Sequence, residues 1–269
     1  MTYADEGAGE AVLLVHGWAA HGGFFADLRE RLARHHRVLT PTLRGHPGSG
    51  HGAAPLSVET LADDIAHFIQ TLGLESVTAL GWSMGAMVLW SAAARLSARL
   101  NGIIVEDMGP RLLNDAAWRS GVVADYAAAD VAATLAEIKA DWPAYVARFA
   151  PRMFAPGAKD HVAWTVTEMS KADPEHMAAF WSSMTQQDFR DALTRIAQPM
   201  LVIHGRDNQV YPDSASEFVA RTAPNARRVL IAGAGHVPHL EAPDQFFNHV
   251  EAFVRTTRQA DLRSGGKQP

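Results

Sequence analysis

Short apolar runs separated by longer amphipathic segments recur along most of this chain. The runs are four or five residues long and are rich in Val, Ile and Leu, which is typical of strands buried on both faces of a parallel sheet. They lie at residues 11–15, 37–40, 76–80, 102–106, 200–204 and 228–231. Because the segments between them have helical spacing, the pattern predicts an α/β fold with a doubly wound, mostly parallel sheet.

The pattern changes between residues 111 and 195. This stretch is rich in Ala, is divided by several prolines and contains no convincing strand. We therefore predict a core domain formed by residues 1–110 and 196–258, a helical cap at 111–195 inserted into it, and a flexible tail at 259–269. Only residues 2–4 could add an antiparallel edge strand, so the sheet is expected to have six or seven strands.

A candidate nucleophile lies between the strand at 76–80 and the helix predicted after it. The sequence there reads Gly81-Trp82-Ser83-Met84-Gly85. A strand, a sharp turn and a helix form the setting of a nucleophile elbow, in which flanking glycines allow the strand and helix to approach closely. This context predicts that Ser83 is catalytic.

The other candidates for a catalytic triad follow later strands. His236, in a Gly-bounded loop after the last strand, is the predicted base, and His239 is the alternative. Asp207 follows the penultimate strand and is the predicted acid, with Asp107 as an alternative because it also ends a strand on the same edge. The order Ser83, Asp207, His236 is the order known for α/β-hydrolases.

An oxyanion hole beside a serine nucleophile needs two preorganised donors aimed at the developing negative charge. The backbone N–H groups of Met84, after the nucleophile, and of Trp18, after the first buried strand, are the predicted donors. The apolar, Trp- and Met-containing cap predicts a water-poor chamber over Ser83. The predicted substrate-binding side chains are Trp18, Trp82, Met108, Phe154, Trp164, Trp181 and Val210, and further candidates for the chamber are Met153, Met169, Phe180 and Met184.

Composition narrows the function by exclusion. The net charge is −5, so nothing suggests nucleic acid or an anionic membrane as partner. The absence of cysteine excludes disulfides and thiolate catalysis. No signal peptide and no apolar run near 18 residues is found, so a cytoplasmic protein is expected. No cofactor and no metal site is expected, because the histidines lack metal-binding spacing.

Several motifs together resemble the α/β-hydrolase family over nearly the full length of the chain. They are His16-Gly17-Trp18, Arg44-Gly45-His46, the Ser83 elbow, Gly205-Arg206-Asp207 and Gly233-Ala234-Gly235-His236. The first motif and the elbow are most similar to small carboxylesterases of the pimeloyl-ACP methyl ester carboxylesterase type. Pro47 departs from the usual Gly, and the cap has no strong basic cluster to dock an acyl carrier protein, so the resemblance implies a carboxylesterase without a defined substrate.

The expected function is hydrolysis of small to medium apolar carboxylic esters through an acyl-enzyme. Lactonases, C–C bond hydrolases and cofactor-free perhydrolases use the same triad and remain alternatives, as does a ligand receptor that keeps the triad without turnover. Haloalkane dehalogenases and epoxide hydrolases resemble this fold but use an aspartate nucleophile, so Ser83 argues against both.

Overall fold

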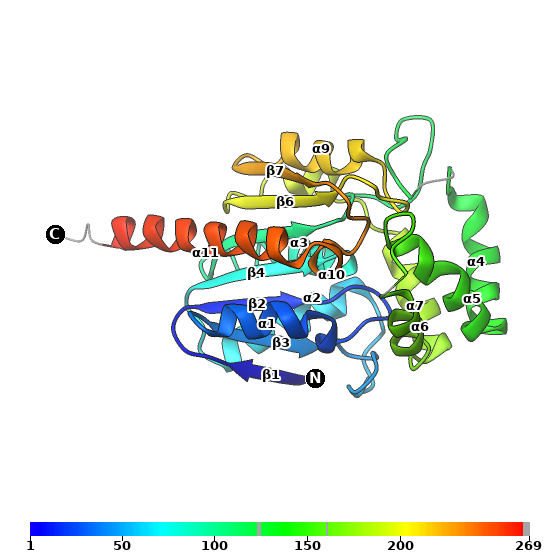
Figure 1. The fold of residues 1–269 in the computed structure, drawn as a ribbon, viewed down its shortest axis with the longest axis horizontal. Helices are drawn as coiled ribbons and strands as arrows, with labels where there is room; N and C mark the ends of the chain where they lie inside the picture. Colours follow the sequence, from blue (N-terminus) through cyan, green and yellow to red (C-terminus); the bar gives the residue numbers. More distant parts are fainter. Residues whose placement is uncertain (123–124, 160, 266–269) are drawn as a thin grey trace.

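The computed structural model describes residues 1–122, 125–159 and 161–265 and contains a seven-stranded sheet (Figure 1). The strand order is β1-β3-β2-β4-β5-β6-β7. The strands are β1 (Thr2–Glu6), β2 (Ala11–Val15), β3 (Arg37–Thr42), β4 (Val77–Trp82), β5 (Leu100–Glu106), β6 (Met200–Gly205) and β7 (Ala226–Ile231). All neighbouring pairs are parallel except β1 with β3, so the predicted α/β-hydrolase fold class is confirmed.

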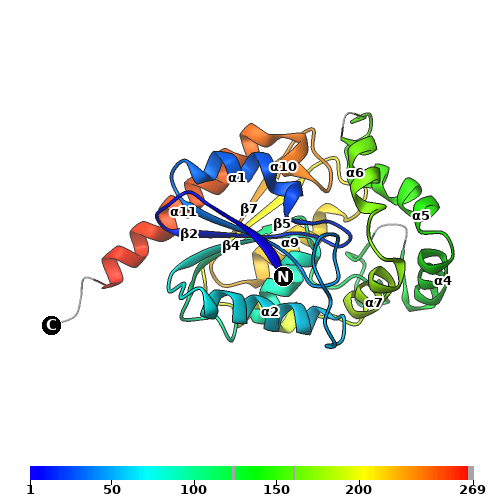
Figure 2. The same ribbon diagram turned by 90° about the horizontal axis from the view of Figure 1, so that it is seen from below.

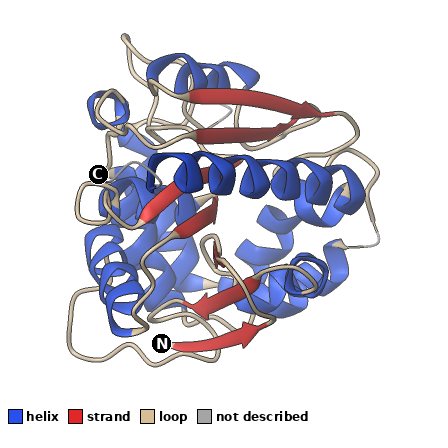
Figure 3. Cartoon of the chain, turned by 90° about the vertical axis from the view of Figure 1, so that its left-hand side faces the viewer, coloured by secondary structure: helices blue, strands red, loops and turns tan. Residues whose placement is uncertain are grey.

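The antiparallel edge strand exists. It is longer than the residues 2–4 that the sequence suggested, and it pairs with β3 from Thr2 opposite Thr42 to Glu6 opposite Val38. Figure 3 shows this strand at the rim of the sheet, beside the amino terminus. The sheet therefore has the larger of the two expected strand numbers.

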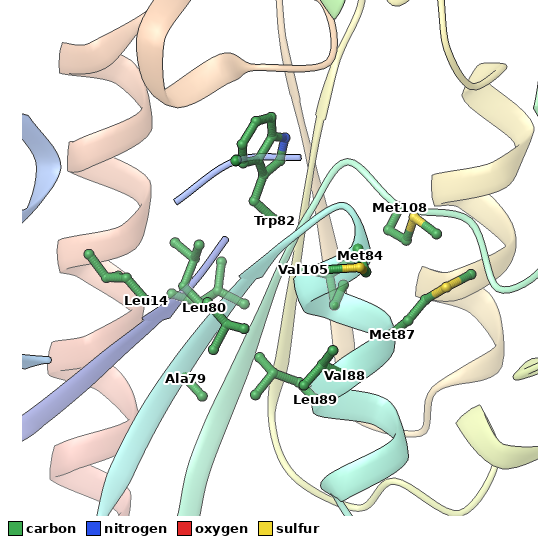
Figure 4. Packing of buried hydrophobic residues seen from close by; sticks show 14 of the residues in the cluster. Leu14, Ala79, Leu80, Trp82, Met84, Met87, Val88, Leu89, Val105 and Met108 are labelled. Carbon is green, nitrogen blue, oxygen red and sulfur yellow. The ribbon is translucent and has the colours of Figure 1, made fainter. Parts of the chain in front are cut away.

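Helices cover both faces of the sheet, which explains why β2 and β4 are buried at every position. The helices of the core are η1 (Gly22–Phe25), α1 (Ala26–Ala33), α2 (Val58–Thr71), α3 (Met84–Ala92), α9 (Asp213–Thr222), α10 (Pro238–Glu241) and α11 (Pro243–Gly265). Helices α1 and α11 pack together on one face, and α2 and α3 pack together on the other (Figure 2). Figure 4 shows Leu14 and Leu80 on one side of the sheet and Met87 and Val88 of α3 on the opposite side.

Residues 111–195, which we call the cap segment, enter after β5 and return to β6. The segment contains α4 (Ala128–Ala140), α5 (Trp142–Phe149), η2 (Ala150–Met153), α6 (Val162–Met169), α7 (Pro174–Thr185) and α8 (Arg190–Leu193). Helices α4 to α7 lie beyond the carboxyl ends of the parallel strands (Figure 1). Several contacts dock them on the core; for example, the Trp18 indole N–H donates to the Met177 carbonyl at 2.9 Å, and His21 Nε2 lies 2.9 Å from a Glu168 carboxylate oxygen.

The last helix is longer than expected. α11 continues to Gly265, whereas the sequence predicted a tail from residue 259. Residues 266–269 of that predicted tail lie outside the described residues. Among the helices that the structure describes, none is long and apolar enough to cross a membrane.

Candidate active site

Ser83 occupies a strained turn between β4 and α3. Its φ of 52° and ψ of −120° lie where non-glycine residues are rare, and its side chain is buried. The flanking glycines are required by close approach, because a Cβ at Gly81 would lie 2.5 Å from the Ala86 nitrogen and one at Gly85 would overlap the Val15 carbonyl. The local geometry is therefore that of a nucleophile elbow.

The loop after β2 lies directly against this turn. A Cβ built on Gly17 would lie 3.2 Å from the Ser83 Cβ, so only a glycine lets the backbone come so near without displacing the serine. Ala19 has a φ of 58°, which turns the chain back toward the core. Gly17, Trp18 and Ser83 line the same small cavity, and Met84 follows Ser83 in the chain, so the two residues whose amides are the predicted oxyanion donors belong to these two adjacent turns.

His236 is buried in the loop after β7 and is fixed by its own backbone. Its N–H donates to the Met153 carbonyl at 2.7 Å, and its carbonyl accepts the Trp82 indole N–H at 2.9 Å. The imidazole lines the same small cavity as Ser83. The structure thus brings the predicted base to the predicted nucleophile.

The carboxylate beside the His236 ring belongs to Asp107. Its Oδ1 lies 3.5 Å from Nδ1 of His236 and 3.1 Å from Nδ1 of His204, without the alignment of full hydrogen bonds. Catalytic contacts are often loose in this way before a substrate binds. The Asn208 amide donates to both oxygens, at 2.6 and 2.5 Å, and Asp107 is completely buried.

The environment of Asp107 keeps it ionised. Burial alone would raise the pKa of its carboxyl, but His204 and His236 outweigh burial and hold that pKa well below its ordinary value. A permanent negative charge behind an imidazole is what a base needs to stabilise its charged form.

Asp207, the predicted acid, has a different partner. Its carboxylate is exposed and accepts the Gly233 backbone N–H at 2.8 Å. After β6 ends at Gly205, the chain turns so that the side chain of Asn208, the residue after Asp207, reaches the Asp107 carboxylate. The expectation for the acid is therefore corrected: the structure gives the position beside His236 to Asp107, and Asp207 stabilises a turn.

His239, the alternative base, has a different partner, the carboxylate of Glu106. Its Nδ1 lies 2.8 Å from Oε1 of Glu106, and the same oxygen accepts the His239 backbone N–H at 3.0 Å. The ring packs against Phe25 and Trp82 in the core. The geometry therefore favours His236 over His239.

Two adjoining cavities lie near the elbow. The inner cavity, of about 20 Å³, is lined by Ser83 and His236, and the outer cavity, of about 500 Å³, lies beyond it and is lined almost entirely by residues of the cap segment. Four residues that line both cavities form the partition between them: Val122, Phe149, Trp181 and Val210. The interior space beside the nucleophile is about the size of one water molecule.

Four of the seven predicted pocket residues line the inner cavity, namely Trp18, Trp82, Trp181 and Val210. The other three line neither cavity. Met108 is core, Phe154 is buried and stacks on His161, and Trp164 is 39% exposed and packs on Phe24. Apolar side chains at helical spacing pack in the interior of a cap as readily as they line a pocket, so the sequence could not separate these three from true pocket residues.

The structure adds inner-cavity residues that the sequence did not single out for the pocket, namely Gly17, Val122, Phe149 and Tyr211. Met153 and Met184, two of the further candidates, are also in the wall. Phe149 could have been found from the sequence, because it follows Tyr145 by one helical turn on the buried side of α5. The outer cavity is more polar and includes Arg148, which pairs with Glu137 at 3.0 Å, and Arg152.

The chain is similar to known proteins over most of its length. A family model described as alpha/beta hydrolase fold matches residues 10–243. A pimeloyl-[acyl-carrier protein] methyl ester esterase of Xanthomonas oryzae pv. oryzae (strain MAFF 311018) is 30% identical over 253 residues, which cover 92% of this chain and 96% of that protein.

Solved esterase structures superpose over nearly all of the chain. A thermophilic esterase from Thermogutta terrifontis has a TM-score of 0.84 and 27% identity, and covers 95% of this chain and 93% of its own. An esterase from Exiguobacterium antarcticum has a TM-score of 0.88 at 24% identity, with 94% of each chain covered, so it shares the fold.

Proposed function

The chain belongs to the α/β-hydrolase fold family and is a hydrolytic enzyme, and we propose that it is a serine carboxylesterase. In this proposal Ser83 is the nucleophile, His236 the general base and Asp107 the acid. The observation that carries it is the shared inner cavity of Ser83 and His236, with the buried Asp107 carboxylate against the far side of the imidazole.

The reaction proceeds in two halves. The Ser83 hydroxyl gives its proton to His236 as its oxygen bonds to the ester carbonyl carbon, and the oxyanion accepts hydrogen bonds from the Trp18 and Met84 amides. The intermediate collapses, the C–O bond to the alcohol breaks, and His236 gives the proton to the leaving alcohol. Water then repeats the sequence on the acyl-enzyme and releases the acid and Ser83.

The cavities favour an ester with one small and one large arm. The inner space holds a group of about methyl size, whereas the outer space of about 500 Å³ accommodates a long chain. The partition is lined by apolar side chains, so the large arm is apolar where it crosses. The relative from Xanthomonas oryzae is named as an esterase of a methyl ester, which is an ester of this shape.

A set of three esters tests this function. We expect purified protein to hydrolyse methyl hexanoate or hexyl acetate, each with one small arm, at least about 10-fold faster than hexyl hexanoate, since a pocket discriminates against each surplus methylene by about 10-fold or more. The Ser83→Ala variant is the control for contaminating esterase. Tight binding of these esters without turnover would instead support the receptor alternative.

A further inference from the structure

Glu241, at the end of α10, joins the catalytic loop to the cap segment. One carboxylate oxygen accepts the Gly235 backbone N–H at 2.7 Å, immediately before His236. The other accepts the Ala155 backbone N–H at 2.6 Å, just after η2 of the cap segment. A single side chain therefore holds two backbone segments that lie about 80 residues apart in sequence.

The two segments are in close contact around this carboxylate. The His236 N–H donates to Met153 O at 2.7 Å, and the Gln209 amide donates to the Phe154 carbonyl at 2.7 Å. A Cβ at Gly235 would lie 2.7 Å from the Ala155 nitrogen, so there is no room for a side chain between them. Met153 lines the inner cavity, so this contact connects the catalytic histidine to the wall of the pocket.

Burial disfavours the charged form of the Glu241 carboxylate. Burial raises the pKa of Glu241, and the backbone N–H groups of Ala155 and Gly235 partly counter that effect. An ionised carboxylate accepts readily at both oxygens, one from each N–H donor. A neutral amide at this position presents one acceptor oxygen and one donor nitrogen, so one of the two backbone N–H groups loses its partner.

We propose that Glu241 is a positioning residue that couples docking of the cap segment to the placement of the His236 ring. The proposal rests on the assignment of His236 as the base of the serine esterase. Glu241 touches neither Ser83 nor the inner cavity, and it acts through the backbone on each side of it. When the link is broken, of the described hydrogen bonds only the one from His236 N–H to the Met153 carbonyl joins the two segments directly, so they move more freely relative to each other, and the productive orientation of the imidazole is populated less.

The test compares Glu241→Gln with Glu217→Gln, a matched change at an exposed ion pair on α9. Hydrolysis is followed with p-nitrophenyl acetate, and hydrogen exchange is followed in peptides that contain residues 153–155 and 233–236. We expect Glu241→Gln to lower kcat by about 10- to 100-fold with KM within about twofold, because small displacements of catalytic groups cost this much. Exchange should rise in both peptides together, and the control should match the wild type.

The outcomes separate the possible failures. A kcat within twofold of the wild type overturns the proposal, and so does faster exchange in only one of the two peptides. If Glu241→Gln does not fold, Glu241→Asp decides, since its shorter side chain cannot reach both the Ala155 and the Gly235 N–H groups and should give a smaller loss of the same kind; unchanged kcat in that variant overturns the proposal. If the wild type hydrolyses no ester, the esterase assignment fails, while the exchange experiment still tests whether Glu241 couples the two segments.

Discussion

Asp107 and His236 lie together although 129 positions separate them: Oδ1 of the aspartate is 3.5 Å from Nδ1 of the histidine. One follows β5 and the other follows β7, and the carboxyl ends of these strands share one edge of the sheet. The carboxylate is fully buried. It accepts hydrogen bonds from the Asn208 amide, in the loop after β6, and Nδ1 of His204 in β6 lies 3.1 Å from it. This relationship identifies Asp107 as the proposed acid.

The first prediction compares the two aspartates. Asp107→Asn should lower kcat by about 10⁴-fold, because an amide allows the wrong tautomer of His236 and cannot stabilise its charged form. Asp207→Asn should stay within about tenfold of the wild type, since the lost contact is an exposed turn. Steady-state kinetics with methyl hexanoate measures kcat for both variants. If Asp207→Asn lost more activity than Asp107→Asn, the acid would be Asp207.

The second prediction concerns the nucleophile. Ser83→Ala should lose about 10⁶-fold in kcat, since the acyl-enzyme cannot form. The wild type should gain the mass of one phosphonyl group after treatment with a fluorophosphonate, and Ser83→Ala should not. Intact mass spectrometry and circular dichroism check labelling and folding, and labelling of the alanine variant at the wild-type rate would exclude Ser83.

The third prediction concerns the partition between the cavities. Trp181 packs edge-on against Trp18, and its indole N–H donates to the Tyr126 hydroxyl at 2.9 Å. Trp181→Ala should join the inner and outer spaces and raise the rate on hexyl hexanoate relative to methyl hexanoate by about 10-fold or more. The matched control is Trp164→Ala, which removes an exposed cap tryptophan that lines neither cavity. An equal effect of both variants would mean that the partition does not select substrates.

The fourth prediction concerns acid stability. Burial lowers the pKa of His46 to about 4, below its ordinary value near 6.5, so the unfolded chain binds a proton that the folded chain does not. The stability that this histidine contributes is complete above pH 6.5 and is lost as the pH falls toward 4. The loss is about 1.4 kcal/mol of unfolding free energy per pH unit, or about 3 kcal/mol over the window.

His46→Asn should flatten the pH dependence of the free energy of unfolding between pH 6.5 and 4. Its amide can donate to the Arg44 carbonyl as the His46 Nδ1 does. Urea unfolding across this range measures the slope, and His67→Asn, on the exposed side of α2, is the control. An unchanged slope in His46→Asn would show that His46 does not drive acid sensitivity.

The fold could be predicted because strands that are buried on both faces of a parallel sheet consist of nearly continuous runs of apolar residues. β2 and β4 are apolar at nearly every position, and the sequence showed where they begin to within about two residues. The elbow was equally clear, since Gly81 and Gly85 are demanded by the contacts of their own backbone. Strand β1 was harder to predict because its side chains are mostly exposed.

The acid could not be predicted, because the choice depends on the path of one turn. Asp207 and Asn208 are adjacent, yet only Asn208 points to the Asp107 carboxylate. Periodicity says which strand a residue follows and not which way the loop after it turns. The pocket was only partly predictable for a related reason, since Trp164 and Trp181 both belong to apolar patterns and only tertiary packing separates them.

The contacts that place Ser83 are made by main chain against main chain. The backbone of Gly85 packs against the Val15 carbonyl, and that of Gly81 packs against the first turn of α3. The Ser83 N–H donates to the Glu106 carbonyl at 2.9 Å. No cap side chain takes part in these contacts. Replacements in the cap segment away from residues 153–155, whose backbone holds the His236 loop, can therefore change which substrates the enzyme accepts while the Ser83 oxygen keeps its position, so new specificities can evolve without a change in the nucleophile.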